Sequence, residues 1–467
     1  MKTFFNQGKF KPLLLIATAG ILASVAIYSH RNNNLVGIAN SYPYSLNQSS
    51  PDRVISNLEN EINFYREKIR HNPDDGLERA ALAKAYLKMA RTTGNVNWYL
   101  LAEQSARQSL VNLPFDNQGA MLVLAHIAEA KHDFKETINL TQQVLQSEPD
   151  SENALALLVS SNLAMGNLDE ADLAAHNLVS KIPALNSFTL RALVHAAQGE
   201  NTSALADFKQ ALALEEPGEE ISSAKTRTFL GRFHSSQGEY ILARQLYQEA
   251  LSIIPDFPFA LVHLAELEIK EGNYSAAEKI YTQLSNTANS AETFDHLALE
   301  GLAQVKFLQG NKSAAEALWQ KAEHEFRHHH EIDSSGHHHH EIDSFGHHHH
   351  EIDSFGHRRE LAHLLLARGN SADLPEALAL MKAEVAIRRD AETLNTLAWI
   401  FHKLGRNDEA QKVFQEALGQ GVKNAEIFYR AGLVEKALGN DNQANKYFEQ
   451  AKQTDNNWFN RLSLEVK

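Results

Sequence analysis

Apolar residues recur at helical spacing along most of the chain, and this pattern predicts an all-α protein. The first such segment carries Leu58, Ile62, Tyr65 and Ile69, each three or four residues after the last, as on one face of a helix. An amphipathic helix is therefore predicted over residues 53–73. Beyond residue 73 the apolar positions group into pairs of short helices separated by polar turns.

These helix pairs share a frame of a glycine, an alanine five residues later and an aromatic residue four beyond that. Gly238, Ala243 and Tyr247 form one set, and Gly272, Ala277 and Tyr281 another, 34 residues on. Further sets are Gly310/Ala315/Trp319, Gly405/Ala410/Phe414 and Gly439/Ala444/Phe448, with Gly166/Ala171 and Gly199/Ala204/Phe208 upstream. Glycine ends a helix cheaply because it adopts the left-handed conformation. A fixed period of this length predicts a solenoid of stacked hairpins.

The frame resembles the tetratricopeptide repeat family. A Leu-Gly or Leu-Ala pair precedes the glycine, as at Leu230-Gly231 and Leu264-Ala265, where the small residue allows the second helix to approach. Prolines at 149, 183, 217 and 255 are placed to stop second helices. The resemblance implies an α-solenoid of about nine or ten hairpins, covering residues 74–327 and 358–457, with a tail at 458–467.

The N-terminal segment has the pattern of an export signal. Lys2, Lys9 and Lys11 precede an uncharged run that ends at Tyr28, as in a signal-anchor or a cleaved signal peptide. Residues 29–52 are polar and are predicted to be a linker. The positive flank predicts that everything beyond Tyr28 lies outside the cytoplasm. The expected location is therefore the cell envelope, either anchored to a membrane or secreted.

A histidine-rich decapeptide repeat interrupts the solenoid at residues 328–357. Its copies read HHHHEIDSFG in the last two instances, and its histidines are His328, His329, His330, His337, His338, His339, His340, His347, His348, His349, His350 and His357. Imidazole with carboxylate suits Zn²⁺, Ni²⁺, Co²⁺ or Cu²⁺. The glycine that ends each copy predicts a flexible tract with interchangeable weak sites. Tandem duplication in a tolerant junction explains the same repeat without a metal role.

Charge and motif content exclude several classes of function. The formal net charge is −14 and no basic stripe is present, so nucleic acid is not expected as a partner. The chain has no cysteine, which removes disulfides and thiolate chemistry. His324-Glu325-x-x-His328 matches the zinc-peptidase pattern, but histidine pairs four apart arise trivially beside such a tract. We therefore expect no enzyme activity and no required cofactor.

The family resemblance also implies where a partner would bind. In tetratricopeptide proteins, positions 2, 5, 9 and 12 of each first helix usually face a groove. In this chain those positions hold Lys225, Thr228, Arg232 and Ser235, then Glu392, Asn395, Trp399 and His402, and last Glu426, Tyr429, Leu433 and Lys436. The candidate contacts taken from these sets are Lys225, Arg232, Asn395, Trp399, His402 and Tyr429. The alternative for Trp399 is that it packs only on a neighbouring helix and contacts no partner.

Two hypotheses of function follow. The first is a scaffold that holds a protein or peptide partner of the envelope in its groove. The second is an accessory that buffers or captures divalent metal through the histidine tract. Deleting residues 328–357 separates them, because it abolishes function only under the second.

Overall fold

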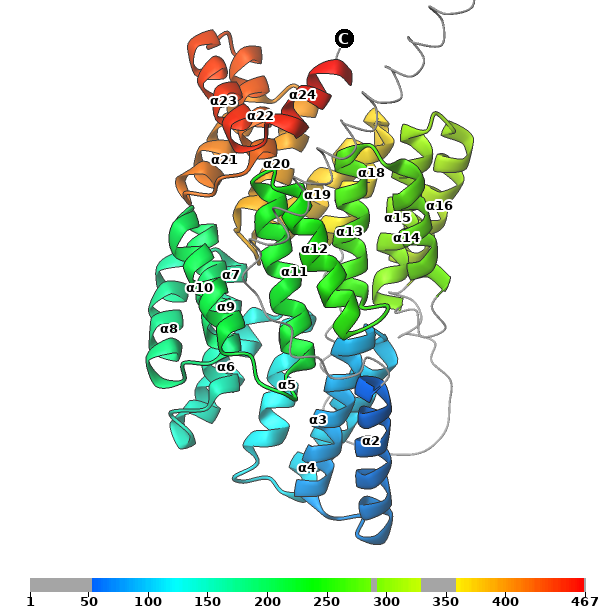
Figure 1. Ribbon diagram of the computed structural model, residues 1–467, viewed down its shortest axis with the longest axis vertical. Coiled ribbons are helices and arrows are strands. Elements are labelled where there is room, and N and C mark those ends of the chain that lie inside the picture. The colour runs from blue at the N-terminus through cyan, green and yellow to red at the C-terminus, as the bar shows by residue number, and fades with distance from the viewer. Residues whose placement is uncertain (1–52, 287–291, 329–357, 466–467) are drawn as a thin grey trace, which may run out of the picture. The chain divides into compact units, whose positions relative to one another are not determined.

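The computed structural model describes residues 53–286, 292–328 and 358–465, and within them every regular element is a helix (Figure 1). A single helix, α2 (Arg53–His71), precedes ten hairpins in these ranges. The hairpins are α3 (Gly76–Thr93) with α4 (Val96–Asn112), α5 (Gln118–Ala130) with α6 (Phe134–Ser147), α7 (Glu152–Met165) with α8 (Leu168–Lys181), α9 (Leu185–Ala197) with α10 (Asn201–Ala213), α11 (Glu220–Ser236) with α12 (Tyr240–Ile253), α13 (Pro258–Glu271) with α14 (Tyr274–Asn286), α15 (Glu292–Leu308) with α16 (Lys312–His328), α18 (Arg358–Arg368) with the short η2 (Ser371–Asp373) and α19 (Leu374–Val385), α20 (Ala391–Lys403) with α21 (Asn407–Gly419), and α22 (Ala425–Ala437) with α23 (Asp441–Thr454). The all-helical repeat architecture predicted from the sequence is confirmed in these residues.

The hairpins stack so that their first helices form one layer. Each first helix contacts the first helix of the next hairpin, from α3 against α5 through to α20 against α22. Each second helix packs against its own first helix and against the first helix that follows. A hairpin therefore buries its apolar face only against its neighbours, as expected for a solenoid.

The glycine–alanine–aromatic frame has the structural roles predicted for it. Gly166, Gly199, Gly238, Gly272, Gly310, Gly405 and Gly439 all adopt positive φ at hairpin turns, and the frame alanines from Ala171 to Ala444 are at most 1% exposed. Gly231 shows why the preceding small residue is needed. A β-carbon there would come within 2.5 Å of the Tyr247 ring, so a larger residue would push the two helices apart.

Both ends of the solenoid are covered by an extra helix. At the N-terminus, α2 buries Val54, Leu58 and Ile62 against the first hairpin. At the C-terminus, α24 (Asn456–Glu465) occupies most of the segment expected to be a tail. It begins after Asp455, whose carboxylate accepts a 3.0 Å hydrogen bond from the Trp458 amide, and a carboxylate in that position caps a helix start.

Hairpin turns far apart in sequence also contact one another within the compact unit Gln48–Lys467. The Arg389 amide donates a 3.2 Å hydrogen bond to the Met165 carbonyl. The Tyr240 hydroxyl lies 2.5 Å from Oδ2 of Asp455. A β-carbon added at Gly199 would lie 2.0 Å from the Gly421 carbonyl oxygen. The turns that end α7, α9 and α11 therefore meet the loops before α20, α22 and α24.

Two sequence predictions fall outside the described residues. These are the membrane segment with its linker, at residues 1–52, and nearly all of the histidine tract, at residues 329–357. Among the helices of the described ranges, none is both long enough and apolar enough to cross a membrane.

Candidate functional site: the inner face of the repeats

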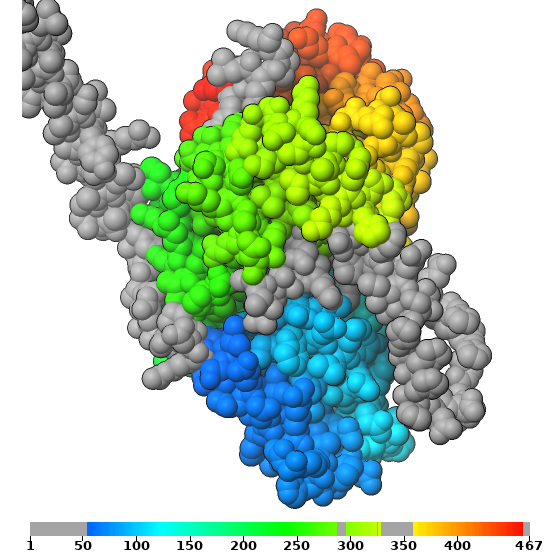
Figure 2. All heavy atoms as spheres, turned by 90° about the vertical axis from the view of Figure 1, so that its right-hand side faces the viewer, coloured from blue at the N-terminus to red at the C-terminus, as the bar shows by residue number. Residues whose placement is uncertain are grey.

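The layer of first helices carries a row of charged and aromatic side chains that face one another, and we call it the inner face. In Figure 2 the hairpins from α11 to α19, green through yellow to orange, occupy neighbouring parts of the visible surface. The inner face is defined by Arg91 on α3, Glu129 on α5, Lys225 and Arg232 on α11, Glu266 on α13, Glu300 on α15, Arg359 and His363 on α18, Glu392 and Trp399 on α20, and Arg430 on α22.

The N-terminal part of the inner face brings two basic side chains within electrostatic reach of each other. The charge of Arg91, followed by incomplete hydration, lowers the pKa of Lys225 to about 7. The charge of Glu129 acts on both Lys225 and Arg91. The Glu129 carboxylate accepts a hydrogen bond from the Ser160 hydroxyl, and its Oε2 lies 3.6 Å from Nδ1 of His126. Incomplete hydration alone would raise the pKa of Glu129, but His126, Ser160 and Arg91 together lower it to about 2. Lys225, whose pKa is about 7, is therefore about half protonated at pH 7, and an anion bound beside Lys225 and Arg91 would favour its charged form.

The C-terminal part is crossed by a contact between distant hairpins. Nη2 of Arg232, on the fifth hairpin, lies 3.6 Å from Oε1 of Glu392, on the ninth. Nη1 of Arg359 lies 3.9 Å from Oε2 of the same glutamate. Incomplete hydration would raise the pKa of Glu392, but these two guanidinium groups lower it. The side chain of Glu392 is still 55% exposed, so it touches water while facing two cations.

His263 on α13 and His363 on α18 both have a pKa below that of an ordinary histidine. Nδ1 of His263 lies 2.8 Å from Oε2 of Glu266, and incomplete hydration lowers the pKa of His263 despite that carboxylate. Nε2 of His363 forms a 2.8 Å hydrogen bond with the Thr396 hydroxyl, in which either group can donate. Incomplete hydration and the charge of Arg359 lower the pKa of His363 to about 4.

Three carboxyl groups of this region interact, since the charges of Glu266 and Glu360 both act on Glu300. The pKa of Glu300 is raised to about 8. Loss of hydration on burial is the largest cause, and repulsion from Glu360 and Glu266 adds to it. Glu300 is therefore largely protonated at pH 7. A cation brought to this point by a partner would remove that proton, because the charged form of the carboxyl would then be stabilised.

The raised pKa of Glu300 predicts a pH-dependent loss of stability. Its pKa is higher in the folded than in the unfolded chain, so its contribution is fully present below about pH 4 and is lost as pH rises towards 8. Glu300→Gln should raise the free energy of unfolding by about 1–2 kcal/mol at pH 9, since the side chain is only partly buried. At pH 4 the effect should be close to zero. Urea unfolding of both proteins at the two pH values measures this, and an equal difference at both would contradict it.

Trp399 is the large aromatic side chain of the inner face. Its ring stacks on His402 at a centroid distance of 4.9 Å. Nζ of Lys403 lies 4.5 Å from the ring centroid, and Cζ of Arg430 lies 5.0 Å from it. Cations over an indole face are attracted to it and restrict its motion. Trp399 is thus partly exposed and held in place, which favours binding because little side-chain freedom is lost.

The predicted groove residues divide into exposed and buried positions. Lys225, Arg232, Trp399, His402 and Tyr429 are all partly exposed. Tyr429 contacts Phe448, Trp458 and Phe459 at centroid distances of 5.6–5.9 Å, so it packs on α23 and α24 rather than on Trp399.

Three residues that the repeat register placed in the groove lie in the packed interior. Asn395 is only 8% exposed, Thr228 0% and Ser235 6%. They are buried because first helices contact one another along this side. Asn395 is therefore not a surface contact in this structure.

The register also contains inner-face residues that the sequence analysis left out. Glu266 and Glu300 follow Arg232 at successive intervals of 34 residues and occupy the same repeat position. Arg91 and Glu129 belong to the first two hairpins, where the glycine–alanine–aromatic frame is weakest. Applying position 9 to every hairpin would have found the two glutamates.

Comparisons with known proteins agree with the repeat architecture. Tetratricopeptide repeat family models match residues 189–260, 234–294, and 391–419 with 425–457. No curated protein matches the chain.

Three solved structures resemble parts of the chain. PilW, described as a widely conserved type IV pilus biogenesis factor, is 18% identical over 47% of this chain and 98% of its own, with a TM-score of 0.37. A tetratricopeptide repeat protein from Parabacteroides merdae is 17% identical over 68% of this chain and 98% of its own, with a TM-score of 0.33. A thermophilic TPR protein from Thermus thermophilus is 21% identical over 40% of this chain and 99% of its own, with a TM-score of 0.35. The segments of this chain that the family models match are tetratricopeptide repeats.

Proposed function

We propose that the chain is a protein–protein interaction scaffold that binds a partner protein or peptide along its inner face. The observation that carries this proposal is the set of partly exposed charged and aromatic side chains on the first helices α3, α5, α11, α13, α15, α18, α20 and α22, which interact across the hairpins. In a packed solenoid such groups add little to folding, because exposed ion pairs contribute about 0–1 kcal/mol each. Tetratricopeptide repeats typically act as non-catalytic scaffolds, which agrees with this reading.

The charges of the inner face favour a particular kind of partner segment. Arg91 and Lys225 suit a carboxylate at one end, while Glu266, Glu300 and Glu360 suit a basic side chain further along. Trp399 adds a rigid aromatic anchor, and such residues dominate interface energetics. We therefore expect a segment with acidic and basic residues separated along its length.

Site-specific photo-crosslinking tests the location of the binding surface. A photo-reactive amino acid at Glu266, whose side chain is 51% exposed on the inner face, should cross-link a partner. The matched control is Leu173, which is 72% exposed on the second helix α8. Once the partner is identified, Trp399→Ala and Arg232→Glu should each weaken binding about 10-fold or more.

The control variant Leu173→Ser should bind the identified partner with unchanged affinity, since it changes an exposed apolar group away from the inner face. Cross-linking of one partner equally from both positions would contradict the proposal. Unchanged affinity in both inner-face variants would do the same.

The location of the protein and the role of its tract remain separate proposals. The basic flank and apolar run of residues 1–28 support tethering to a membrane, with the repeats outside the cytoplasm. Cell fractionation with and without residues 1–28 tests this. The twelve histidines of the tract support capture of divalent metal, and titration of Zn²⁺ or Ni²⁺ with and without residues 328–357 tests that.

A further inference from the structure

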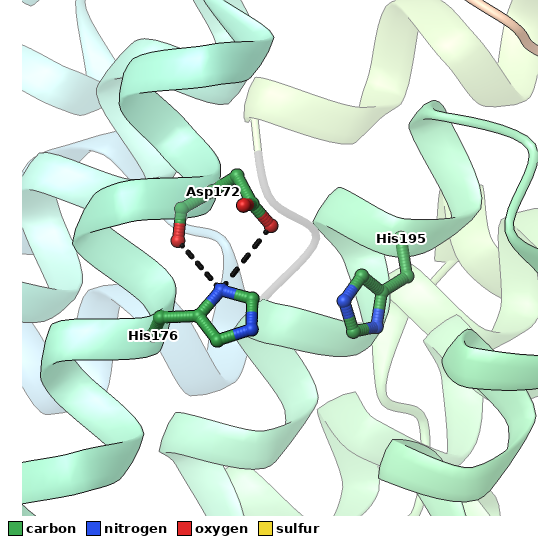
Figure 3. Close-up of side chains that lie close together, drawn as sticks. All are labelled: Asp172, His176 and His195. Carbon is green, nitrogen blue, oxygen red and sulfur yellow. Dashed lines mark hydrogen bonds and ion pairs between the residues drawn. The ribbon is translucent and has the colours of Figure 1, made fainter.

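Away from the inner face, three side chains with metal-binding chemistry meet between the third and fourth hairpins. Asp172 and His176 lie on α8, and His195 lies on α9 (Figure 3). One oxygen or ring nitrogen of each lies within 4.8 Å of those of the other two. Within the described residues this is the one group of three or more histidine, aspartate or glutamate side chains with such spacing.

The local structure explains why these three side chains meet. Asp172 and His176 are four residues apart and so share one face of α8. Nδ1 of His176 lies 3.0 Å from the Asp172 carbonyl oxygen and 3.3 Å from its Oδ1. α8 packs against α9, and this packing brings His195 to the same place, with the two rings 5.9 Å apart between centroids.

His195 has the surroundings of a fixed ligand. It is 8% exposed, and its Nδ1 is buried without a hydrogen bond. Oδ2 of Asp207 lies 3.2 Å from that nitrogen. A carboxylate beside a histidine orients the ring and raises its basicity at many metal sites.

The charge balance around the group favours a cation. Asp207 is neutralised by Arg191, whose Nε and Nη2 donate hydrogen bonds of 2.8 and 2.7 Å to its two oxygens. The negative charge of Asp172 is left beside two imidazole rings. Arg191 also attracts Asp172 at longer range, but its guanidinium is already engaged by both oxygens of Asp207.

We propose that Asp172, His176 and His195 bind a divalent transition-metal ion of the Zn²⁺ class. Bonds of about 2.0–2.2 Å in a tetrahedral site place ligand atoms roughly 3.4 Å apart. His176 must therefore move inwards, and its side chain is 54% exposed and able to do so. Three protein ligands leave one position for water. The ion connects α8 to α9 and so joins two adjacent hairpins.

Hydrogen exchange of the full chain, followed peptide by peptide with and without Zn²⁺, tests the site separately from the histidine tract. Metal held by the tract does not link α8 to α9, so only the proposed site slows exchange in residues 168–197. We expect protection there at micromolar Zn²⁺. His176→Ala and Asp172→Asn should weaken the apparent zinc affinity, read from this protection, at least about 10-fold.

The matched control is His71→Ala. His71 is exposed, and its Nδ1 lies 2.7 Å from the carbonyl of Glu67 four residues earlier. This repeats the local geometry of Asp172 and His176 without a third ligand in reach among the described residues. The zinc effect on residues 168–197 should be unchanged in this variant. No protection of α8 and α9 by Zn²⁺, or the same protection in His176→Ala, would overturn the proposal.

Discussion

Replacing Arg227 with methionine is expected to lower the free energy of unfolding by about 3–5 kcal/mol. Arg227 is 0% exposed, and its Nη1 and Nη2 donate hydrogen bonds of 2.9 and 3.0 Å to the two oxygens of Glu215. Its Nε lies 3.1 Å from Oε2 of Glu249. Methionine fills similar space but leaves the buried carboxylate of Glu215, whose side chain is 7% exposed, without this cation, and a buried unpaired charge is costly.

Hydrogen exchange of the α11–α12 hairpin in increasing denaturant measures this effect locally. A local probe assigns the loss to this hairpin, whereas unfolding of the whole chain reports only the summed effect on the array. The control is Arg107→Met, since Arg107 is 67% exposed and pairs with Glu103 one helical turn away. Such surface pairs contribute less than about 1 kcal/mol. Equal losses in the two variants would contradict the predicted role of Arg227.

A second substitution distinguishes lost charge pairing from lost packing. Adding Glu215→Gln to Arg227→Met removes the charge of the buried carboxylate that Arg227→Met leaves without its cation. If unpaired charge is the cause, the double variant should be more stable than Arg227→Met alone. If the loss comes from packing, Glu215→Gln should bring no recovery.

The fold could be predicted from the sequence because each repeat imposes the same local requirements. A residue such as Gly272, with φ of 79°, ends a first helix, and Ala277 is buried where two helices cross. These are short-range constraints that recur at a fixed interval. The helix α24 has a local signal in its cap Asp455, but the sequence did not show that Trp458 and Phe459 pack against Tyr429, and this contact forms only in the fold.

The candidate site was predictable only in part. Register alone placed Arg232 and Trp399 on the first helices, and both are partly exposed there. It could not show that Thr228 and Asn395 are buried, because their exposure depends on how closely neighbouring first helices approach. The pairing of Arg232 with Glu392 joins residues 160 positions apart, a separation that a local pattern does not encode.

The metal-binding group shows the same limit. Asp172 and His176 form a common spacing on one helix, which carries little information alone. His195 joins them only through the packing of α8 against α9. The histidine tract drew attention to metal in the sequence, whereas the folded group has just two histidines.

Gly199→Ala is expected to lower the free energy of unfolding by about 2–4 kcal/mol, from two separate causes. Gly199 has φ of 75°, and a left-handed residue with a β-carbon costs about 1–2 kcal/mol. The new β-carbon would also lie 2.0 Å from the carbonyl oxygen of Gly421. Backbone cannot rotate away as a side chain can, so the turn after α9 must separate from the turn after α21.

Comparison with Gly310→Ala isolates the second cause, the clash with the Gly421 carbonyl. Gly310 has φ of 83° at an equivalent turn, and a β-carbon there meets nothing within 4 Å, so it carries the conformational cost alone. The difference between the two variants, read by denaturant unfolding, therefore reports the contact between hairpins four and nine. If Gly199→Ala costs no more than Gly310→Ala, the two turns do not touch in solution.

If the difference is present, Gly421→Ala should disrupt the same contact, because its β-carbon would lie 2.4 Å from the Gln198 carbonyl oxygen. The double variant should then lose less than the sum of the single losses, since a contact already broken cannot be broken again.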